Sequence, residues 1–451
     1  MTKRVSTEKT TNEKLSFNEL NDKLSVFSPD GAIIEDSIYA KIDEWIPTGS
    51  YIFNAALSGS LFGGMPNRRS LMFAGEEGTG KTYLACSIVR NAQAMGYFPV
   101  YYDSEGSIDI DFVKRLGIDT SKFRIENIGT VEEFTTLAAN LNETVAEIKK
   151  TGKTPPKIIA VLDSLGSLSS TKEKNDAISG SDKRDMTKQQ AIRKTFRVIG
   201  NDFAKNGIPF IICNHVYAAI GSYIPGNVIS GGGGGKYSPS IMFTLTKSKL
   251  TDKDSEEHVK KLGLEAAKVG IVVTVHPFKQ RFARPIKVQI HIPFYKKPNP
   301  FVGLEKFVNW ETCGIVRGNM ITEKDYKKLS PVDQKKCYQF LIPADGLKNG
   351  DDGTRYAQPK DTARKLVCEH LGGEIPIAEL YTEKVFTDEI LHKLDDNIIK
   401  KTFMLPSIES LDDLAEVTGD LLDDAEMGDI NLESEEIKNV IDDLDISISE
   451  D

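Results

Sequence analysis

The 451-residue chain has none of the features that would place it in a membrane or outside the cell. No stretch of about 18 uncharged apolar residues occurs, so the sequence predicts no membrane-spanning helix. The N-terminal stretch MTKRVSTEKTTNEKL has no apolar core of a secretory signal. The five cysteines are scattered and form no CxxC pair, which favours reduced thiols over a disulfide framework. We therefore expect a cytoplasmic protein with no membrane partner.

Basic residues are nearly absent from the C-terminal end of the chain. Residues 407–451 contain 17 Asp and Glu but only one lysine, Lys438, which is a balance of −16. Because the whole chain carries −9, the other 406 residues carry +7. A basic body attracts polyanions, and a tethered acidic segment can compete for the same surface, recruit basic partners or simply solubilise the chain. We expect residues 407–451 to be a disordered acidic tail.

From about Trp45 onward, short apolar runs alternate with helix-length segments. The expected buried strands are residues 71–74, 99–103, 157–162, 209–213 and 241–245, and the expected helices are residues 81–95, 131–150 and 187–206. Residues 270–275 and 286–292 are expected to form a later, hairpin-like pair of strands. Strand–helix alternation of this kind predicts an α/β domain with a mostly parallel, twisted sheet.

Changes in composition suggest four parts of the chain. Residues 1–44 are polar, with one amphipathic stretch from Leu15 to Phe27. We expect this N-terminal part to be an oligomerisation segment whose small helix docks on a neighbour, although its composition fits a frayed terminus equally well. Residues 45–295 form the predicted core. The run KKPNP marks the start of a small C-terminal lobe, residues 296–406, and the acidic tail follows.

A complete P-loop motif provides the first candidate site. Residues 75–82, GEEGTGKT, match G-x-x-x-x-G-K-[ST] directly after an expected strand and at the start of an expected helix. Backbone N–H groups of such a loop and the helix dipole bind phosphates. Lys81 is expected to reach the β- and γ-phosphates of ATP and Thr82 to hold Mg²⁺. The predicted nucleotide-binding residues here are Gly75, Glu76, Glu77, Gly78, Thr79, Gly80, Lys81, Thr82 and Tyr83.

Two carboxylates follow other expected strands. Asp163 ends the apolar run IIAVL, about 80 residues after the P-loop, where a Walker B aspartate would orient Mg²⁺ and its waters. Glu105 comes just after the strand PVYYD, at the carboxyl end of a strand where ligands bind in parallel sheets. It is the candidate general base that activates the attacking water.

In this order and spacing the motifs resemble those of the RecA-type DNA recombinases, and particularly the UvsX-type recombinases of phages. The supporting stretches are PTGS at 47–50, NAALSG at 54–59, YDSE at 102–105, LDSLG at 162–166 and CNH at 213–215. The resemblance covers roughly residues 45–315. It implies an α/β fold with a RecA-like P-loop ATPase core, a small N-terminal segment and a small C-terminal lobe.

The resemblance also implies roles for further residues. Asp109 and Phe112 match positions that contact adenine, and Glu105 matches the family's water-activating glutamate. Lys279 and Arg281 match a pair of cations that reach the γ-phosphate of the next subunit in a filament. Because side chains alternate along a strand, cations two residues apart point the same way, which suits a phosphate clamp supplied in trans.

Two polar loops carry DNA binding in this family, and their counterparts here are residues 169–185 and 216–236. We expect both to be flexible loops that become ordered on a polyanion. The predicted DNA-binding residues are Lys172, Lys174, Lys183, Arg184, Arg193, Tyr217, Tyr223, Ile224 and Lys236. Cations would hold phosphates, and the tyrosines and the isoleucine would offer surfaces to bases. The second loop contains five consecutive glycines, 231–235.

His215 stands where bacterial RecA proteins commonly carry glutamine and UvsX-type proteins carry histidine. It lies between the nucleotide site and the second loop, so it is a candidate sensor of the γ-phosphate. The chain has Tyr217 and Ala219 where bacterial RecA has basic residues, and this weakens the assignment of individual DNA contacts in that loop.

The implied function is an ATP-dependent DNA strand-exchange recombinase for recombination, repair and recombination-dependent replication. It would form a filament on single-stranded DNA, pair that strand with homologous duplex, and work with a single-strand-binding protein and a recombination mediator. The implied enzyme is a DNA-dependent ATPase that releases ADP and phosphate; release of AMP is left open.

Two other functions share part of the pattern. A hexameric RecA-fold helicase has the same Walker motifs, but it usually carries an N-terminal primase-binding domain, and about 45 residues precede the core here. A catalytically idle ATP-binding filament or signalling protein would not need Lys81, Thr82, Glu105 and Asp163, all of which are present.

Overall fold

The computed structural model describes residues 16–28, 31–35, 37, 40–179, 187–218, 227–229, 239–251, 253–261, 268–342, 347 and 351–406. The described residues up to Leu405 belong to one compact unit, and Pro406 is the only described residue of a second unit. None of the described helices is both long enough and apolar enough to cross a bilayer.

A mostly parallel sheet forms the centre of the first unit. Within the described residues it has nine strands, in the order β11-β10-β9-β3-β7-β6-β4-β5, with β8 paired to β7. The strands are β3 (Ser70–Gly75), β4 (Tyr97–Asp103), β5 (Arg124–Asn127), β6 (Lys157–Asp163), β7 (Phe210–Ala218), β8 (Asn227–Ile229), β9 (Ile241–Lys249), β10 (Gly270–Lys279) and β11 (Val288–Pro293). The strands from β9 to β5 run parallel, whereas β10 is antiparallel to both β9 and β11.

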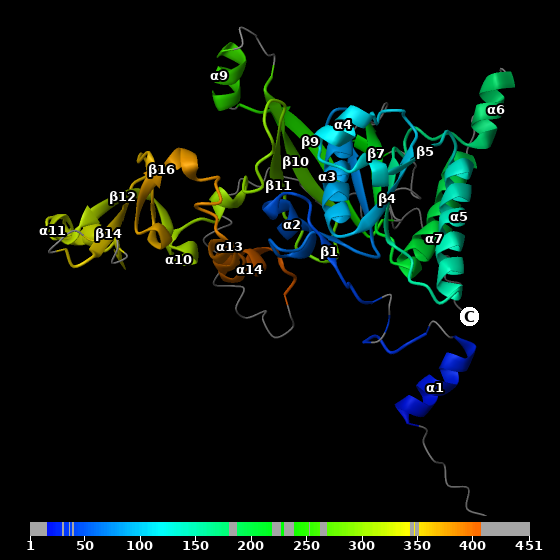
Figure 1. Ribbon diagram of the computed structural model, residues 1–451, viewed down its shortest axis with the longest axis horizontal. Coiled ribbons are helices and arrows are strands. Elements are labelled where there is room, and N and C mark those ends of the chain that lie inside the picture. The colour runs from blue at the N-terminus through cyan, green and yellow to red at the C-terminus, as the bar shows by residue number, and fades with distance from the viewer. Residues whose placement is uncertain are drawn as a thin grey trace, which may run out of the picture. The chain divides into compact units, whose positions relative to one another are not determined.

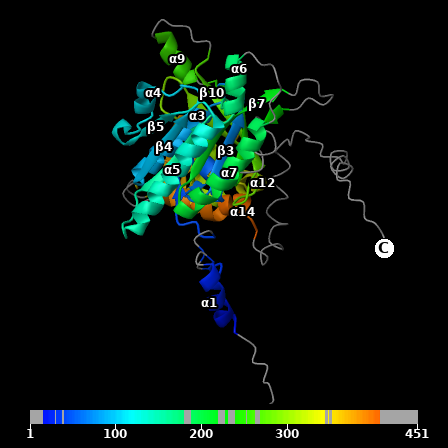
Figure 2. The ribbon, with the colours of Figure 1, turned by 90° about the vertical axis from the view of Figure 1, so that its right-hand side faces the viewer.

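Helices cover both faces of this sheet. The helices of this part of the chain are α3 (Lys81–Ala94), α4 (Ile110–Arg115), η1 (Thr120–Lys122), α5 (Val131–Lys150), α6 (Thr171–Ser179), α7 (Thr187–Asn206) and α9 (Lys253–Lys261). In Figure 1, α3 lies to the left of β4 and β7, while α5 and α7 lie to their right. Figure 2 shows α5 and α7 next to each other in front of the sheet, where they contact one another.

Alternate residues of the strands contribute to the two layers of the core. Leu71 and Phe73 of β3 belong to the buried cluster that includes α3, whereas Met72 and Ala74 belong to the cluster that includes α5 and α7. A strand that is buried on both faces must be apolar at every position, which explains the continuous apolar runs of the sequence. The structure confirms each strand and helix expected for residues 71–292, including the antiparallel pair β10 and β11.

Two segments expected to be flexible loops contain regular structure. Helix α6 occupies part of residues 169–185, so the expectation of a flexible loop is wrong there. The cause is a capping box, in which Ser170 Oγ accepts a bond from Glu173 N at 3.0 Å and Glu173 Oε2 accepts one from Ser170 N at 3.3 Å. In the second segment, residues 216–218 of β7 pair with β8 as an antiparallel ribbon. Residues 180–186, 219–226 and 230–238 lie outside the described residues.

The N-terminal elements are α1 (Phe17–Phe27), β1 (Trp45–Ile46), α2 (Tyr51–Ser58) and β2 (Met65–Pro66). Ser16 and Glu19 form a capping box at the start of α1, which confirms a helix within the amphipathic stretch. No residue of α1 is buried, and Phe17 and Phe27 are 89% and 87% exposed. The helix therefore presents apolar side chains that the described part of the chain does not cover.

The C-terminal lobe combines an antiparallel sheet with short helices. Its elements are η2 (Leu304–Lys306), α10 (Trp310–Cys313), β12 (Ile315–Thr322), α11 (Glu323–Tyr326), α12 (Pro331–Gln334), β13 (Tyr338–Leu341), β14 (Thr354–Pro359), β15 (Lys365–Cys368), η4 (Glu369–Leu371), β16 (Gly373–Pro376), η5 (Ile377–Glu379), α13 (Asp388–Leu394), the π-helix η6 (Asp395–Ile399) and α14 (Lys400–Phe403). The strand order is β13-β14-β12-β15-β16.

The last helices of this lobe pack against segments next to the central sheet. Buried Asp395 accepts hydrogen bonds from Leu61 N at 2.7 Å and Ser60 Oγ at 2.8 Å, just after α2. The carbonyl of Phe403 accepts a bond from Arg284 N at 2.6 Å. These contacts tie the segments that follow α2 and β10 to the C-terminal helices.

Candidate nucleotide-binding and catalytic site

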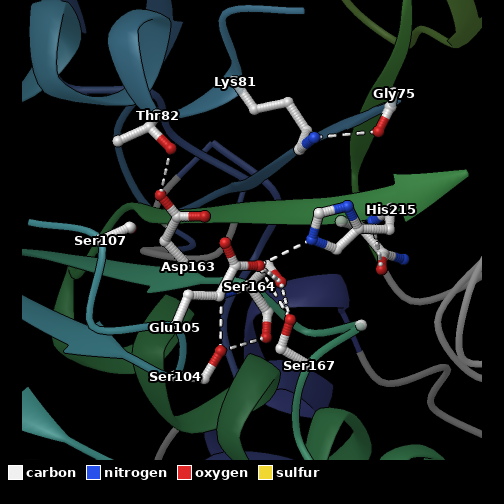
Figure 3. A network of polar contacts seen from close by, with 12 residues as sticks. Gly75, Lys81, Thr82, Ser104, Glu105, Ser107, Asp163, Ser164, Ser167 and His215 are labelled. Atoms are coloured by element: carbon white, nitrogen blue, oxygen red, sulfur yellow. Dashed lines mark hydrogen bonds and ion pairs between the residues drawn. The ribbon is translucent and has the colours of Figure 1, made fainter. Parts of the chain in front are cut away.

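The P-loop connects the carboxyl end of β3 to the first turn of α3. Gly78 and Gly80 have φ of +69° and +88°, values that favour glycine, and Gly80 caps α3. Lys81 Nζ donates to the carbonyls of Gly75 and Glu76, at 2.9 Å each, and so lies inside the loop (Figure 3). Burial lowers the pKa of Lys81. The loop therefore presents backbone donors and a lysine to one point at the N-terminus of a helix.

A pocket of about 950 Å³ opens in front of the P-loop. The pocket is lined by Lys81 and Thr82 of the P-loop, by Glu105 and Asp163, the two carboxylates that follow other strands, and by His215. Tyr83 also lines it, and burial raises the pKa of that tyrosine. The volume, the loop of backbone donors and the buried lysine fit a nucleoside triphosphate.

Asp163, which ends β6, is 1% exposed and faces the P-loop helix. Its Oδ2 accepts hydrogen bonds of 2.6 Å from Thr82 Oγ1 and from the hydroxyl of Tyr101. Burial raises the pKa of Asp163, while these two hydroxyls oppose that rise. A bound cation would favour the ionised carboxylate, so Thr82 and Asp163 fit a Mg²⁺ site that shares its ligands with phosphate oxygens and water.

Glu105 lies in a cluster of hydrogen-bond donors. Its Oε1 contacts His215 Nε2 at 2.6 Å and accepts bonds from the hydroxyls of Ser164 and, at 2.8 Å, Ser167 (Figure 3). Burial alone would raise the pKa of Glu105, but the hydrogen bonds from His215, Ser164 and Ser167 outweigh it and hold that pKa below its usual value. The carboxylate is therefore kept ionised, as a general base requires.

The short segment that carries Glu105 is itself fixed by β4 and β6. Asp103 Oδ1 accepts bonds from Glu105 N at 3.0 Å and Gly106 N at 2.9 Å. Ser104 Oγ donates to Ser164 O at 2.7 Å and accepts from Ser164 N at 2.8 Å. Because these bonds hold the backbone on both sides of Glu105, its side chain is the part of this segment best able to move.

Replacing His215 by alanine is expected to move the acid limb of the pH–rate profile of ATP hydrolysis to higher pH. The change removes the donor that contributes most to lowering the pKa of Glu105, so this pKa rises and the base becomes protonated at higher pH than in the parental chain. Initial rates without DNA, the state in which His215 contacts Glu105, measure the shift from about pH 4 to 7. His370→Ala, which removes an imidazole of the C-terminal lobe, is the control. Identical acid limbs for the parental and His215→Ala chains would contradict the role assigned to this contact.

The two predicted adenine contacts differ in position. Phe112 lines the nucleotide pocket. The carboxylate of Asp109 caps α4 by accepting a bond from Phe112 N at 2.7 Å, and it is not among the residues that line the pocket. Phe294 and Tyr295, which are about half exposed, also line the pocket, and the sequence did not point to them.

Lys247 is a further pocket residue that the sequence analysis missed. It is near the end of β9, next to the P-loop strand, and its Nζ donates to the carbonyl of Glu77. The available signal was a strand that ends in two lysines, Lys247 and Lys249, with period two. A cation at this position adds positive charge where the phosphates of a nucleotide would lie.

Lys279 and Arg281 lie apart from the nucleotide pocket of the same chain. Lys279 pairs with Met242 at the start of β9, at the amino end of the parallel strands, whereas the P-loop leaves their carboxyl end. Between the two cations, Gln280 donates to the carbonyl of Ala56 in α2 and accepts a bond from Arg281 N at 2.7 Å. Neither cation is among the described residues that line the pocket.

The predicted DNA-binding residues are scattered, and several cannot be placed. Lys172 and Lys174 are on α6, where Lys174 Nζ is 3.7 Å from a carboxylate oxygen of Glu133. Arg193 is exposed on α7, and Tyr217 is in β7, opposite Val228. Lys183, Arg184, Tyr223, Ile224 and Lys236 lie outside the described residues.

Comparison with known proteins supplies independent information. Residues 29–294 match the RecA N-terminal domain. The chain is 27% identical over 205 residues to the "Recombination and repair protein" of Enterobacteria phage T4, which covers 45% of this chain and 50% of that protein. It is 27% identical over 267 residues to "Protein RecA" of Treponema denticola, 58% of each chain. It is 39% identical over 88 residues to "Protein RecA" of Mycobacterium sp. (strain KMS), 20% of this chain and 24% of that one. The chain thus spans at most 58% of the length of these relatives.

Proposed function

Because this chain belongs to the RecA family, we propose that it is an ATP-dependent DNA strand-exchange recombinase. The observation that carries the proposal is the single pocket in which Lys81, Thr82, Asp163, Glu105 and His215 meet. The family supplies the expectation of DNA as partner, and the pocket supplies the chemistry of a regulated ATPase. The relative named for recombination and repair in phage T4 supports the same assignment.

In the proposed reaction, Glu105 orients the attacking water and accepts its proton. Lys81 and the backbone N–H groups of the P-loop stabilise the charge that develops on the transferred phosphoryl group. Bound Mg²⁺ would neutralise the phosphates at Thr82 and Asp163. The proposed products are ADP and phosphate.

The contact between His215 and Glu105 suggests how DNA regulates this reaction. His215 is on β7, in register with Gly75 of the P-loop, and the β7–β8 ribbon begins at the next residue, Val216. A strand of DNA that binds to the segment joining β7 and β8 would move this ribbon, and His215 with it. Glu105 would then be released from its donor and could turn toward the water. This coupling would make ATP hydrolysis depend on bound DNA.

We also propose that the active form is a helical filament. The exposed apolar side chains of α1 suit docking on a neighbouring subunit, and the position of Lys279 and Arg281 suits a phosphate clamp supplied to that neighbour. The proposed partners are single-stranded DNA, homologous duplex, a single-strand-binding protein and a recombination mediator. The proposed location is the cytoplasm. If a phage encodes the chain, this is the cytoplasm of the host cell.

Strand exchange between a circular single strand and a homologous linear duplex tests this function. We expect joint molecules that require ATP and Mg²⁺, and helical filaments in electron micrographs of the chain with single-stranded DNA and a slowly hydrolysed ATP analogue. A heterologous duplex is the matched control and should give no joint molecules. Closed rings that unwind a duplex without pairing homologous strands would replace the recombinase with the helicase alternative.

A further inference from the structure

Three contacts hold the carboxylate of Glu105, and all of them go to the same oxygen. Oε1 accepts hydrogen bonds from the hydroxyls of Ser164 and Ser167 and lies 2.6 Å from Nε2 of His215. The proposed coupling to DNA acts through His215 alone. Movement of the imidazole would leave two hydroxyls bound to the carboxylate, and hydrogen bonds to a charged group are stronger than those between neutral groups. Release of Glu105 therefore needs a second change, at the serines.

The two serines differ in how firmly they are held. Ser164 is fully buried, and its N–H donates to Ser104 Oγ at 2.8 Å while its carbonyl accepts a bond from the same hydroxyl at 2.7 Å. Ser167 is exposed, and its Oγ lies 2.8 Å from the Glu105 oxygen and 3.0 Å from Ser164 Oγ. Figure 3 shows Ser167 and the P-loop lysine on opposite sides of the Glu105 carboxylate. Ser167 is thus the hydroxyl that can leave the carboxylate with the least disturbance of the core.

The backbone next to Ser167 packs against His215. A Cβ on Gly166 would lie 3.0 Å from Cδ2 and 3.3 Å from Cβ of His215, so a glycine at this position lets the imidazole approach the chain closely. The two donors to Glu105 therefore belong to one packed cluster, although one of them follows β6 and the other lies in β7. Displacement of either donor changes the packing around the other.

Each of these donors stands just before a segment that is expected to bind DNA. Ser167 comes two residues before the segment 169–185, and His215 comes one residue before the segment 216–236. A single polyanion that engages both segments would act on both donors. The two segments thus have a common target, which is one oxygen of the candidate base.

Two lysines help to hold the chain around Ser167 and α6 in place. Lys174 Nζ on α6 is 3.7 Å from a carboxylate oxygen of Glu133. Lys188 Nζ, in the first turn of α7, donates to the carbonyl of Gly166 at 3.4 Å. The phosphates of bound DNA would compete for both lysines. Loss of the bond between Lys188 and Gly166 would free the backbone next to Ser167.

We propose that Ser167 is a positioning residue that keeps Glu105 away from the attacking water while no DNA is bound. The candidate base is then held by two segments of the chain, and fast hydrolysis begins only when DNA displaces Ser167 as well as His215. A subunit that engages DNA through one segment alone would remain a slow ATPase. This inference rests on the proposed function, and it assigns a role to a residue that the coupling through His215 does not use.

Hydrolysis of ATP without DNA by Ser167→Ala tests the inference. When the hydroxyl is absent, Glu105 leaves its resting position more easily, so kcat without DNA should rise about 10-fold, the effect of losing one hydrogen bond to a charged group. KM for ATP should not change, because Ser167 is not among the residues that line the nucleotide pocket. The rate with saturating single-stranded DNA should stay close to the parental rate, since this bond is already broken in that state.

Two control variants make the test specific to the hydroxyl. Ser167→Thr keeps a hydroxyl at this exposed position and should restore the low rate without DNA. Ser169→Ala makes the same change two residues further on, where backbone bonds to Gly129 and Val131 are retained, and should behave like the parental chain. Combining Ser167→Ala with His215→Ala should raise the rate without DNA more than either change alone, because each removes a contact to the same oxygen.

Three results would overturn the inference while leaving the proposed function in place. A rate without DNA that is unchanged in Ser167→Ala, or that rises equally in Ser169→Ala, would show that this hydroxyl does not hold the base. Lower rates both with and without DNA would mean that Ser167 assists Glu105 instead of restraining it. Failure of Ser167→Thr to restore the parental rate would assign the effect to the shape of the side chain. A parental chain whose ATP hydrolysis does not respond to DNA would refute the proposed function, and this inference with it.

Discussion

Replacing both Lys279 and Arg281 by alanine is expected to lower DNA-dependent ATP hydrolysis by about 10³-fold or more, the range found for cations supplied in trans to a transferred phosphoryl group. ATP binding and the fold of the subunit should be retained, because neither side chain lines the nucleotide pocket of its own chain. Gln280 and Arg284 hold this segment through their contacts with Ala56 and Phe403, and both remain in the variant. The measurement is steady-state hydrolysis with and without single-stranded DNA, beside nucleotide binding by equilibrium titration.

Mixed filaments distinguish action in trans from action within one subunit. Subunits with Lys81→Ala lack the P-loop lysine but keep both cations, whereas the double variant keeps the P-loop. In an equal mixture about a quarter of the interfaces pair an intact P-loop with intact cations, so part of the activity should return. Lys249→Ala with Lys287→Ala, which removes two exposed lysines outside the pocket, is the control for charge and should hydrolyse ATP at close to the parental rate. No recovery in mixtures of the two folded variants would exclude the trans arrangement.

Glu105→Gln is expected to lower the turnover of ATP by about 10²-fold or more while ATP binding is preserved, because an amide cannot accept the proton of the attacking water. The amide can still bond to Ser164 and Ser167, so the geometry of the pocket should change little. Single-turnover hydrolysis measures the chemical step, and titration with a fluorescent ATP analogue measures binding.

The matched control for this change is Glu143→Gln, which makes the same substitution at an exposed position of α5. It should hydrolyse ATP at the parental rate. Hydrolysis by Glu105→Gln at the parental rate would remove Glu105 from the role of base. A loss of ATP binding that matches the loss of turnover would instead make it a binding residue.

Local sequence signals were sufficient to predict those parts of the fold whose geometry is set within one continuous segment of the chain. The P-loop was predictable because its glycines, its lysine and the strand before it are contiguous in the chain. The central strands were predictable because burial on both faces requires unbroken apolar runs. Ser170 and Glu173 carry a capping box that also predicts a helix, but the polar composition around them obscured it. The strands of the C-terminal lobe, such as β12 and β14, are only partly buried, so they lack the clear pattern of the core.

Contacts between residues far apart in the chain could be predicted only in outline. Parallel strands place their carboxyl ends at one edge of a sheet, so the sequence predicted that Glu105, Asp163 and His215 would be near the P-loop. His215 is 110 residues from Glu105 in the chain, and the sequence did not show that its ring nitrogen lies 2.6 Å from the Glu105 carboxylate. Nor did it show that the hydroxyl of Tyr101 donates to Asp163. Those pairings depend on which strands are neighbours and on how each side chain is rotated, and no local pattern encodes either.

The sequence by itself determined the α/β fold, the phosphate-binding loop and the residue types of the ATPase chemistry, because each depends on periodicity or on a contiguous motif. The tertiary structure alone decided the partners of Glu105, the separation of Lys279 and Arg281 from their own P-loop, and the gathering of Arg68, Arg69, Arg193, Arg197 and Arg281 around one cavity. The physical reason is that these five arginines come from three separate segments, before β3, on α7 and after β10. Only the packing of these segments at the amino ends of the strands brings their charges around one cavity.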